Sequence, residues 1–212
     1  MALVGLSQEV MRPTALVLNL FVAGIVVVRF HAAGALPLRP LLPLALGSVP
    51  AAFVGGSIDL PGELYRPLVA LALLAGAWRL ATAAPADGEA AAGVPWMAGL
   101  AAGAGIGLLA GLTGTGGGIF LTPLLVLAGW TRTREAAGLS GAFILLNSIS
   151  GLGGLVNAGI SLPPSLPLWV AAVVTGGLAG SWAGATRFSI LQLRRVLAVV
   201  LVVAAIKLVL FP

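Results

Sequence analysis

The stretch Gly111-Leu-Thr-Gly-Thr-Gly-Gly-Gly-Ile-Phe-Leu-Thr-Pro123 decides how this chain can fold. It places five glycines within eight residues, in the middle of an apolar run that carries no charge from Trp96 to Trp130. Each glycine in a helix interior costs about 1 kcal/mol relative to alanine, so a continuous helix through this stretch is unfavourable. We therefore predict a broken helix whose second half begins with free backbone N–H groups.

The composition of the 212-residue chain is that of a membrane protein. Hydrophobic residues make up 59% and charged residues only 8%, with a mean hydropathy of +1.12, whereas soluble domains are about 25% charged. The net charge of +5 is typical of proteins whose cytoplasmic loops carry Arg and Lys. We therefore predict an all-α polytopic membrane protein with about 7–8 membrane helical segments.

Residue types that the sequence lacks exclude several classes of function. It has no cysteine and one histidine, His31, so disulfides, thiol catalysis and most metal sites are excluded. The glycine-rich stretch lacks the Gly-Lys-Ser/Thr of a phosphate-binding loop, and the apolar spans hold no cluster of catalytic side chains. We predict a protein that is not an enzyme, with no catalytic residue, metal or cofactor and no binding to nucleic acid.

A helix of about 20 apolar residues crosses a hydrocarbon core about 30 Å thick. The sequence predicts such spans near residues 11–30, 37–57, 64–83, 136–158, 166–186 and 190–211. The segment 96–129 is too long for one straight crossing, so it either crosses once as a broken helix or returns to its starting face. The return obeys the positive-inside rule better, because it places eight arginines on one face of the membrane and only Arg12, Arg66 and Lys207 on the other. We favour the return.

The polar linker 85–95 divides the chain into a first transmembrane half, 1–84, and a second transmembrane half, 96–212. Small residues recur across the linker at a constant offset of 129: Gly47, Ala51 and Gly55 match Gly176, Gly180 and Gly184. We therefore expect two related halves, with the substrate site at their interface as in many transporters. The first half has no copy of the glycine-rich stretch, so we expect it to be N-terminally incomplete.

Two sets of glycines recur at intervals of four residues. They are Gly103, Gly107 and Gly111 before the break, and Gly176, Gly180 and Gly184 near the C-terminus. Small residues at this spacing form a stripe on one helix face and allow another helix to approach closely. Both stripes predict close helix packing.

Three stretches in their order along the chain resemble a known family. They are the glycine-rich segment Gly111–Leu125, the segment Thr133-Arg-Glu-Ala-Ala-Gly-Leu-Ser140 and the block from Leu6 to Gly56. Together they resemble the sulfite exporter TauE/SafE family, also called the TSUP family of membrane permeases. The resemblance implies a multi-pass protein of the bacterial inner membrane that carries sulfite and small organosulfur or carboxylate anions. The chain departs from the family pattern in lacking the first glycine-rich helix.

An oxyanion substrate needs hydrogen-bond donors, and the broken helix and its neighbours offer them. Backbone N–H groups of Gly116, Gly117 and Gly118 lie at the positive end of a helix dipole. Hydroxyl and amide groups extend the predicted substrate-binding site, which also includes Thr113, Thr115, Asn147, Ser150 and, in the first half, Asn19. Serine and threonine in membrane helices usually bond their own helix backbone, whereas a buried asparagine amide needs a partner.

We expect this site to export small oxyanions by alternating access around the broken helix. No Asp or Glu lies within a predicted span, so a carboxylate relay for protons or sodium is disfavoured. The alternative is a non-transporting membrane subunit or an inactive truncated transporter, in which the glycines serve packing alone. The expected partners are the lipid bilayer and a small anionic substrate, and a homo-oligomer stays open.

Overall fold

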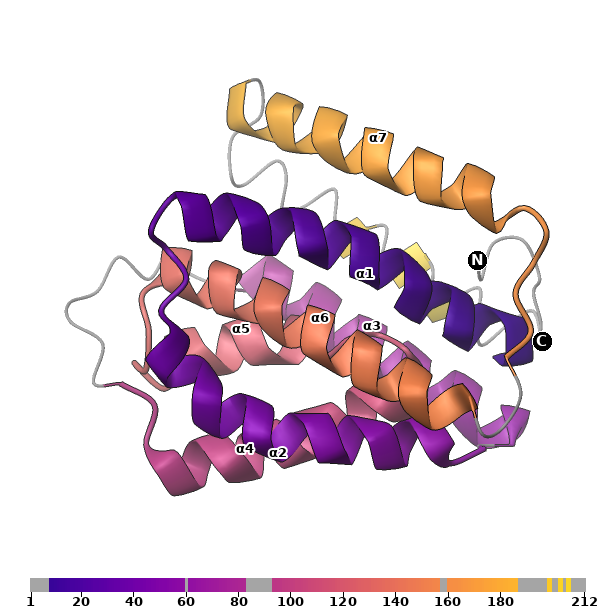
Figure 1. Cartoon of the computed structure of the whole chain (residues 1–212), viewed down its shortest axis with the longest axis horizontal. Helices are drawn as coiled ribbons and strands as arrows, with labels where there is room; N and C mark the ends of the chain where they lie inside the picture. The colour runs from indigo at the N-terminus through magenta and orange to yellow at the C-terminus, as the bar shows by residue number, and fades with distance from the viewer. Residues whose placement is uncertain are drawn as a thin grey trace.

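The computed structural model describes residues 8–59, 61–82, 93–156 and 160–186, together with residues 198, 199, 202, 203, 205 and 206. Most of the predicted linker 85–95 and of the predicted span 190–211 lies outside the described residues. The described chain is all helical (Figure 1). Its helices are α1 (Gln8–Ala32), α2 (Leu38–Ser57), α3 (Gly62–Thr82), α4 (Trp96–Thr113), α5 (Gly118–Leu127), α6 (Thr133–Val156) and α7 (Leu166–Thr186).

The helix bounds agree closely with the predicted spans outside the glycine-rich segment. Helices α1, α2, α3, α6 and α7 cover the spans predicted near 11–30, 37–57, 64–83, 136–158 and 166–186. Four helical segments in the described part are long and apolar enough to cross a membrane: Glu9–Ala32, Leu38–Ser57, Trp96–Thr113 and Arg134–Val156. The all-α membrane class is therefore confirmed, whereas the number of 7–8 spans, the two related halves and their boundaries stay predictions.

The glycine-rich segment breaks the helix, as predicted. Helix α4 ends at Thr113 and α5 begins at Gly118. Between them Gly114, Gly116 and Gly117 adopt positive φ values of 74°, 74° and 80°. Only glycine adopts this left-handed conformation without strain, and this explains why the break needs so many glycines.

The break reverses the direction of the chain, so that the segment 96–129 returns to the end of the molecule at which it starts. Leu121 and Leu125 of α5 belong to one buried cluster with Ala136 and Leu139 at the start of α6. The same cluster packs against Val94, just before α4. In Figure 1, α4 begins and α5 ends on the left side of the view. The structure therefore has the returning arrangement that the arginine distribution favours.

Helices α2 and α4 run parallel with their backbones in close contact. A Cβ added to Gly103 would lie 2.2 Å from the Leu44 carbonyl oxygen, and one added to Gly111 would lie 2.2 Å from that of Ala52. From the other side, a Cβ on Gly47 would lie 2.2 Å from the Leu100 carbonyl oxygen. The predicted close packing of the first glycine stripe is thus confirmed.

The second predicted glycine stripe lies on α7, where its first member, Gly176, is described. A Cβ added to Gly176 has nothing within 4 Å. The close packing predicted for this stripe is therefore absent at Gly176 in the described part of the structure.

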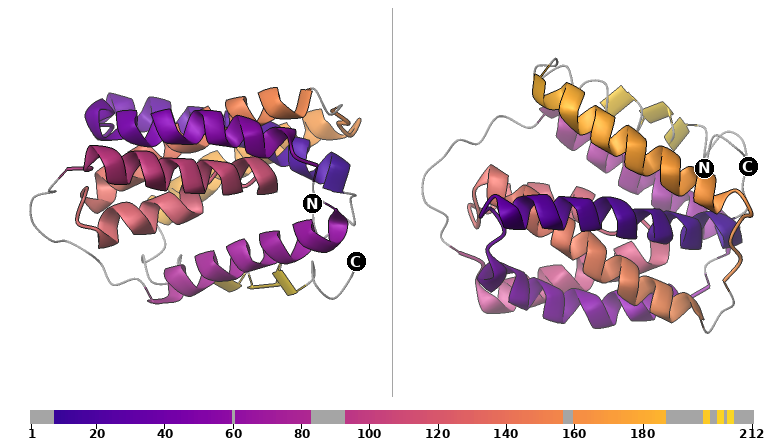
Figure 2. Two further views of the ribbon diagram at one scale, coloured as in Figure 1. Left: turned by 90° about the horizontal axis from the view of Figure 1, so that it is seen from below. Right: turned by 45° about the horizontal axis from the view of Figure 1, so that its top comes forward.

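Helix α6 is the most buried of the four candidate spans and packs against α1, α2, α4 and α5. It runs antiparallel to α1, since Gly141 contacts Val26 while Gly151 contacts Leu16. It runs parallel to α2, because Gly138 meets Ala35 just before α2 and Gly154 meets Phe53 near the end of α2. Figure 2 shows α3 on one flank of this bundle, beside the described C-terminal residues.

Candidate functional site

The start of α5 presents backbone N–H groups that the described chain leaves unpaired. Its N-cap residue is Gly117, which has no side chain that could cap the helix. The N–H groups of Phe120 and Leu121 both donate to the Gly117 carbonyl oxygen at 3.1 Å. No described group accepts from the N–H groups of Gly118 and Ile119. Helix starts with free N–H groups are natural binding sites for anions.

The glycines that form this start are buried inside the helix bundle. Gly116 packs against Ile144 of α6, and Gly117 against Phe143 of α6 and Ile106 of α4. A Cβ on Gly118 would lie 2.4 Å from Ile144 Cδ1. The N–H groups therefore lie among packed helices, where water screens charge less than at a surface.

Thr113 and Thr115 shape the loop between α4 and α5. The Thr113 hydroxyl donates to the Leu109 carbonyl oxygen at 2.6 Å, which is the usual bond of a threonine within a helix. Thr113 Oγ1 lies 2.9 Å from Thr115 Oγ1 and accepts from the Thr115 N–H at 3.4 Å. Of these two predicted residues, Thr113 has its hydroxyl proton committed to its own helix.

Asn19, near the middle of α1, holds the same loop from the first part of the chain. Its Nδ2 donates to the Gly114 carbonyl oxygen at 3.3 Å. The same atom lies 3.0 Å from the position that a Cβ on Gly116 would take. Helix α1 thus reaches the glycine break through Asn19, and the binding role of this residue stays a prediction.

Asn147 is fully buried on α6, and neither its Oδ1 nor its Nδ2 has a described hydrogen-bond partner. It lies one helical turn beyond Phe143 and Ile144, which contact the glycines of the break. A buried amide without partners costs roughly 2–7 kcal/mol in an apolar environment. Packing gives no reason for such a residue at this position, so it is the strongest side-chain candidate for contact with a substrate.

Ser150, the remaining predicted residue, is engaged elsewhere. Its hydroxyl donates to the Val49 carbonyl oxygen of α2 at 2.5 Å. The structure therefore brings Asn19, Thr113, Thr115 and the three glycines together at the break, places Asn147 one turn away, and uses Ser150 to join α6 to α2.

Arg12 is a residue of this region that sequence reasoning missed, because its charge, at the start of the predicted span 11–30, was counted only toward membrane sidedness. It is 5% exposed on α1. Its Nε donates to the Gly111 carbonyl oxygen, its Nη1 to that of Ile58 and its Nη2 to that of Gly56, each at 2.9 Å. Its Nη2 also donates to the Gly55 carbonyl oxygen. A charged residue within an apolar span is by itself a signal of function.

Ser48 of α2 was also missed, and Ser148 of α6 is a second buried serine outside the predicted site. Both are fully buried, and the hydroxyl oxygen of each lacks a described hydrogen-bond partner. In sequence alone, a single serine in an apolar helix carries no signal that separates it from one that bonds its own backbone.

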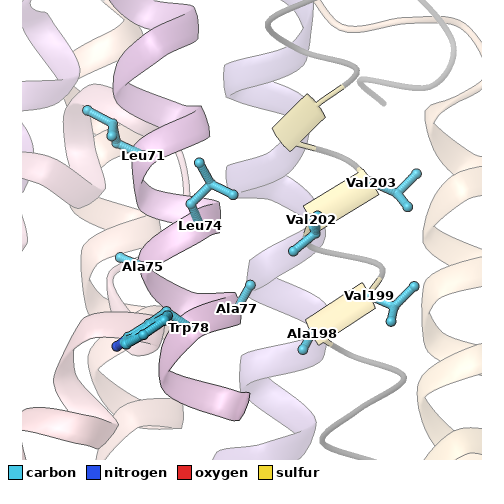
Figure 3. Close-up of a pocket in the computed structure, with 9 residues that line it drawn as sticks. All are labelled: Leu71, Leu74, Ala75, Ala77, Trp78, Ala198, Val199, Val202 and Val203. Carbon is cyan, nitrogen blue, oxygen red and sulfur yellow. The ribbon is translucent and has the colours of Figure 1, made fainter. Parts of the chain in front are cut away.

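A second region of the molecule can be set aside as the site of an anion. Helix α3 and residues 198, 199, 202 and 203 line an apolar groove of about 770 Å³, with Leu71, Leu74 and Trp78 on one wall and Val199 and Val202 on the other (Figure 3). Its described lining residues offer only aliphatic and aromatic surface apart from the Trp78 ring nitrogen. The groove lacks the donor set that an oxyanion requires.

Comparisons with known proteins identify a family of membrane transporters. A family model described as "Sulfite exporter TauE/SafE" matches residues 1–208. The chain is similar to the "Probable membrane transporter protein y4hK" of Sinorhizobium fredii (strain NBRC 101917 / NGR234), with 36% identity over 212 residues that cover 98% of this chain and 86% of that protein. No solved structure matches the chain.

Proposed function

The chain belongs to the sulfite exporter TauE/SafE family of membrane transporters, and from this premise we propose that it is a permease that exports small oxyanions. The substrates we propose are sulfite, organosulfonates and related small carboxylates. The proposed mechanism is alternating access, in which helices rearrange around the break between α4 and α5. We further propose the bacterial inner membrane as its location.

The observation that carries this proposal is the pairing of a free helix start with an unpartnered amide. The N–H groups of Gly118 and Ile119 have no described acceptor, and Asn147 is fully buried with no described partner for either polar atom. An oxyanion accepts several hydrogen bonds at once and would satisfy donors of both kinds. The positive end of the α5 dipole adds to the attraction.

The distribution of acidic residues supports an exit driven by the membrane potential. The described carboxylates Glu9, Glu63 and Glu135 lie in the first turns of α1, α3 and α6, and Asp59 lies between α2 and α3. None of the four is in a helix interior. Expelling an anion from a negative interior is favoured by about 2.3 kcal/mol per charge per 100 mV. Efflux on this scheme needs no proton or sodium relay.

The test is efflux of sulfite and methanesulfonate from proteoliposomes, comparing wild type with Asn147→Leu. Leucine has the same branched outline of heavy atoms as asparagine, with bulkier methyl groups, and it removes buried polar atoms that have no described partner, so no described hydrogen bond is lost. We expect the variant to melt at or above the wild-type temperature in detergent. We expect its efflux rate to be lower than that of wild type by a factor of at least about ten. Gly117→Leu is a poor test, because a Cβ there meets Ile106 and Phe143 at 2.9 Å on a positive-φ backbone.

Thr131→Val is the matched control. Thr131 Oγ1 is also buried and unpartnered, but it lies between α5 and α6 at the far end of α5 from the break. We expect this variant to keep full flux. Equal flux in wild type and Asn147→Leu would refute the role of Asn147, and an absence of flux in wild type would favour the non-transporting alternative.

A further inference from the structure

The side chain of Ile144 on α6 packs directly against the start of α5. The atoms nearest to a Cβ built on Gly118 are Ile144 Cδ1 and Cγ1, with Cγ1 at 2.7 Å, and a Cβ on Gly116 would lie 2.7 Å from Ile144 Cγ2. Gly118 is the first residue of α5 and is not among the glycines with positive φ, so its backbone conformation does not require glycine. The room that Ile144 needs explains the glycine at this position.

Ile144 also borders the free N–H groups of α5. In a helix the bond from Cα to Cβ is tilted toward the N-terminus, so the space that a Cβ on Gly118 would take lies toward the open start of α5. Ile144 fills this space, next to the N–H groups of Gly118 and Ile119, for which no described group is an acceptor. An anion bound to these N–H groups would therefore have Ile144 as a neighbour.

The next turn of α6 adds two buried polar side chains. Asn147 and Ser148 are fully buried, and the side-chain polar atoms of both lack described hydrogen-bond partners. Side chains in a helix lean toward its N-terminus and cover the preceding turn, so these two lean toward the turn of Ile144. Since buried polar groups in native proteins are nearly always satisfied, two such side chains beside a free helix start indicate a ligand.

Contacts on both sides of this turn show which way it faces. On one side Ile144 contacts Gly116 of the glycine break. On the other side a Cβ on Gly151 would lie 3.7 Å from Gly111 Cα, near the end of α4. The two polar side chains lie between these levels of α6, on the part of the helix that adjoins the break.

Ile144 is also close to the accessible surface. The Nδ2 atom of Asn19 lies 3.0 Å from the position of a Cβ on Gly116, the point that Ile144 Cγ2 approaches at 2.7 Å. Asn19 and Ile144 are both partly buried, whereas Gly116 is buried. Ile144 is thus an apolar side chain at the edge of a polar region that contains the start of α5.

From this geometry we infer that Ile144 is a specificity-determining residue, which limits the size of the anion that the site accepts. This inference rests on the proposed transport function and deepens it. The oxyanion group is bound by the N–H groups of α5 and by Asn147 and Ser148, and the substituent on its sulfur or carbon atom lies against Ile144. A substituent larger than a methyl group overlaps with the Ile144 side chain, as in the overpacking of a protein core.

The test compares two sulfonates of different length. Purified wild type, Ile144→Ala and Ile144→Val are titrated in detergent with sodium methanesulfonate and with sodium butane-1-sulfonate at constant ionic strength. The concentration dependence of the melting temperature gives each Kd. Butane-1-sulfonate exceeds methanesulfonate by as many carbons as Ile144→Ala removes, so the variant creates space of matching size.

We expect wild type to bind methanesulfonate at least about tenfold more tightly than butane-1-sulfonate. We expect Ile144→Ala to bind butane-1-sulfonate at least about tenfold more tightly than wild type does. Ile144→Val removes only Cδ1, the atom against Gly118, and should give an intermediate ratio of the two Kd values. Because this change is small, it tests the inference even if Ile144→Ala folds poorly.

Ile149→Ala is the matched control, because Ile149 is on the same helix but is 55% exposed. We expect this variant to keep the wild-type ratio of the two Kd values, and an equal change there would overturn the inference. A wild-type ratio in both Ile144 variants, or binding of neither anion by wild type, would overturn it too.

The same proteins in proteoliposomes separate this inference from the proposed function. Methanesulfonate efflux by wild type together with an unchanged ratio in the Ile144 variants would leave transport in place and overturn the role of Ile144. Binding that changes with substituent size as expected, without efflux of either anion, would refute transport and leave the role of Ile144 in place.

Discussion

Arg12 joins three helices through one side chain. It belongs to α1, and its guanidinium donates to carbonyl oxygens at the C-terminal ends of α2 and α4. These carbonyls have no partner within their own helices, and a positive charge there also interacts favourably with both helix dipoles. The residue thus stabilises the corner of the bundle that adjoins the glycine break, where Gly114 packs against it.

Replacing Arg12 by methionine should therefore destabilise the fold. Several hydrogen bonds to a charged group disappear, so we expect the free energy of unfolding to fall by at least about 3 kcal/mol, with Arg12→Lys between this and wild type because lysine lacks the planar fork. The exposed Arg39→Met is the control, with an expected change within about 0.5 kcal/mol. Melting in detergent measures both, and equal losses at the two positions would contradict the role given to Arg12.

At this scale the sequence allowed only part of the site to be predicted. The glycines and the two asparagines could be singled out, since glycine clusters and amides are costly in an apolar helix. Arg12 and Ser48 could not, because the helix ends that Arg12 bonds and the full burial of Ser48 follow from the packing of the helices and not from residue type. Ser150 was predicted on type and spacing, and it instead bonds a neighbouring helix.

The helix α4 has two faces that respond differently to an added methyl group. A Cβ on Gly103 would lie 2.2 Å from the Leu44 carbonyl oxygen, whereas a Cβ on Gly105 meets nothing within 4 Å. The same chemical change is thus an overpacking on one face and an ordinary gain in helix propensity on the other. Helix bounds could be predicted from hydropathy, and the stripe could be predicted from spacing, but its partner α2 could not.

We expect Gly103→Ala to lower the free energy of unfolding by about 1–3 kcal/mol or more, as overpacking of a close contact does. Gly105→Ala is expected to be neutral or stabilising by up to about 1 kcal/mol. The two variants differ by two positions on one helix, so their melting temperatures in detergent can be compared directly. A stable Gly103→Ala protein would mean that α2 and α4 are less close than described.

In the whole molecule, the return of the chain at the break determines which loops share a side. The turn after α1, the start of α4 and the end of α5 lie at one end, and the end of α2 lies at the other. Four exposed arginines, Arg29, Arg39, Arg132 and Arg134, belong to the first end. By the positive-inside rule we expect that end to face the cytoplasm.

Because the chain contains no cysteine, single cysteines can report this sidedness without background. We expect Ala33→Cys and Ala128→Cys to react with a membrane-impermeant maleimide from the cytoplasmic side. Asp59→Cys and Ile160→Cys should react from the opposite side. Labelling in vesicles of known orientation shows from which side each cysteine reacts. Reaction of Ala128→Cys and Asp59→Cys from the same side would mean that residues 96–129 cross the membrane once.

The backbone contact between α2 and α4 has a mechanical consequence. Helices whose carbonyl oxygens lie against each other's glycines along their length can neither slide nor separate without breaking the whole seam. We therefore expect α2 and α4 to move as one rigid unit, although α2 precedes residues 85–95 and α4 follows them. If the protein works by the proposed alternating access, the boundary between its moving parts is then set by this packing and not by the midpoint of the sequence, and the hinge we expect lies at the glycines between α4 and α5.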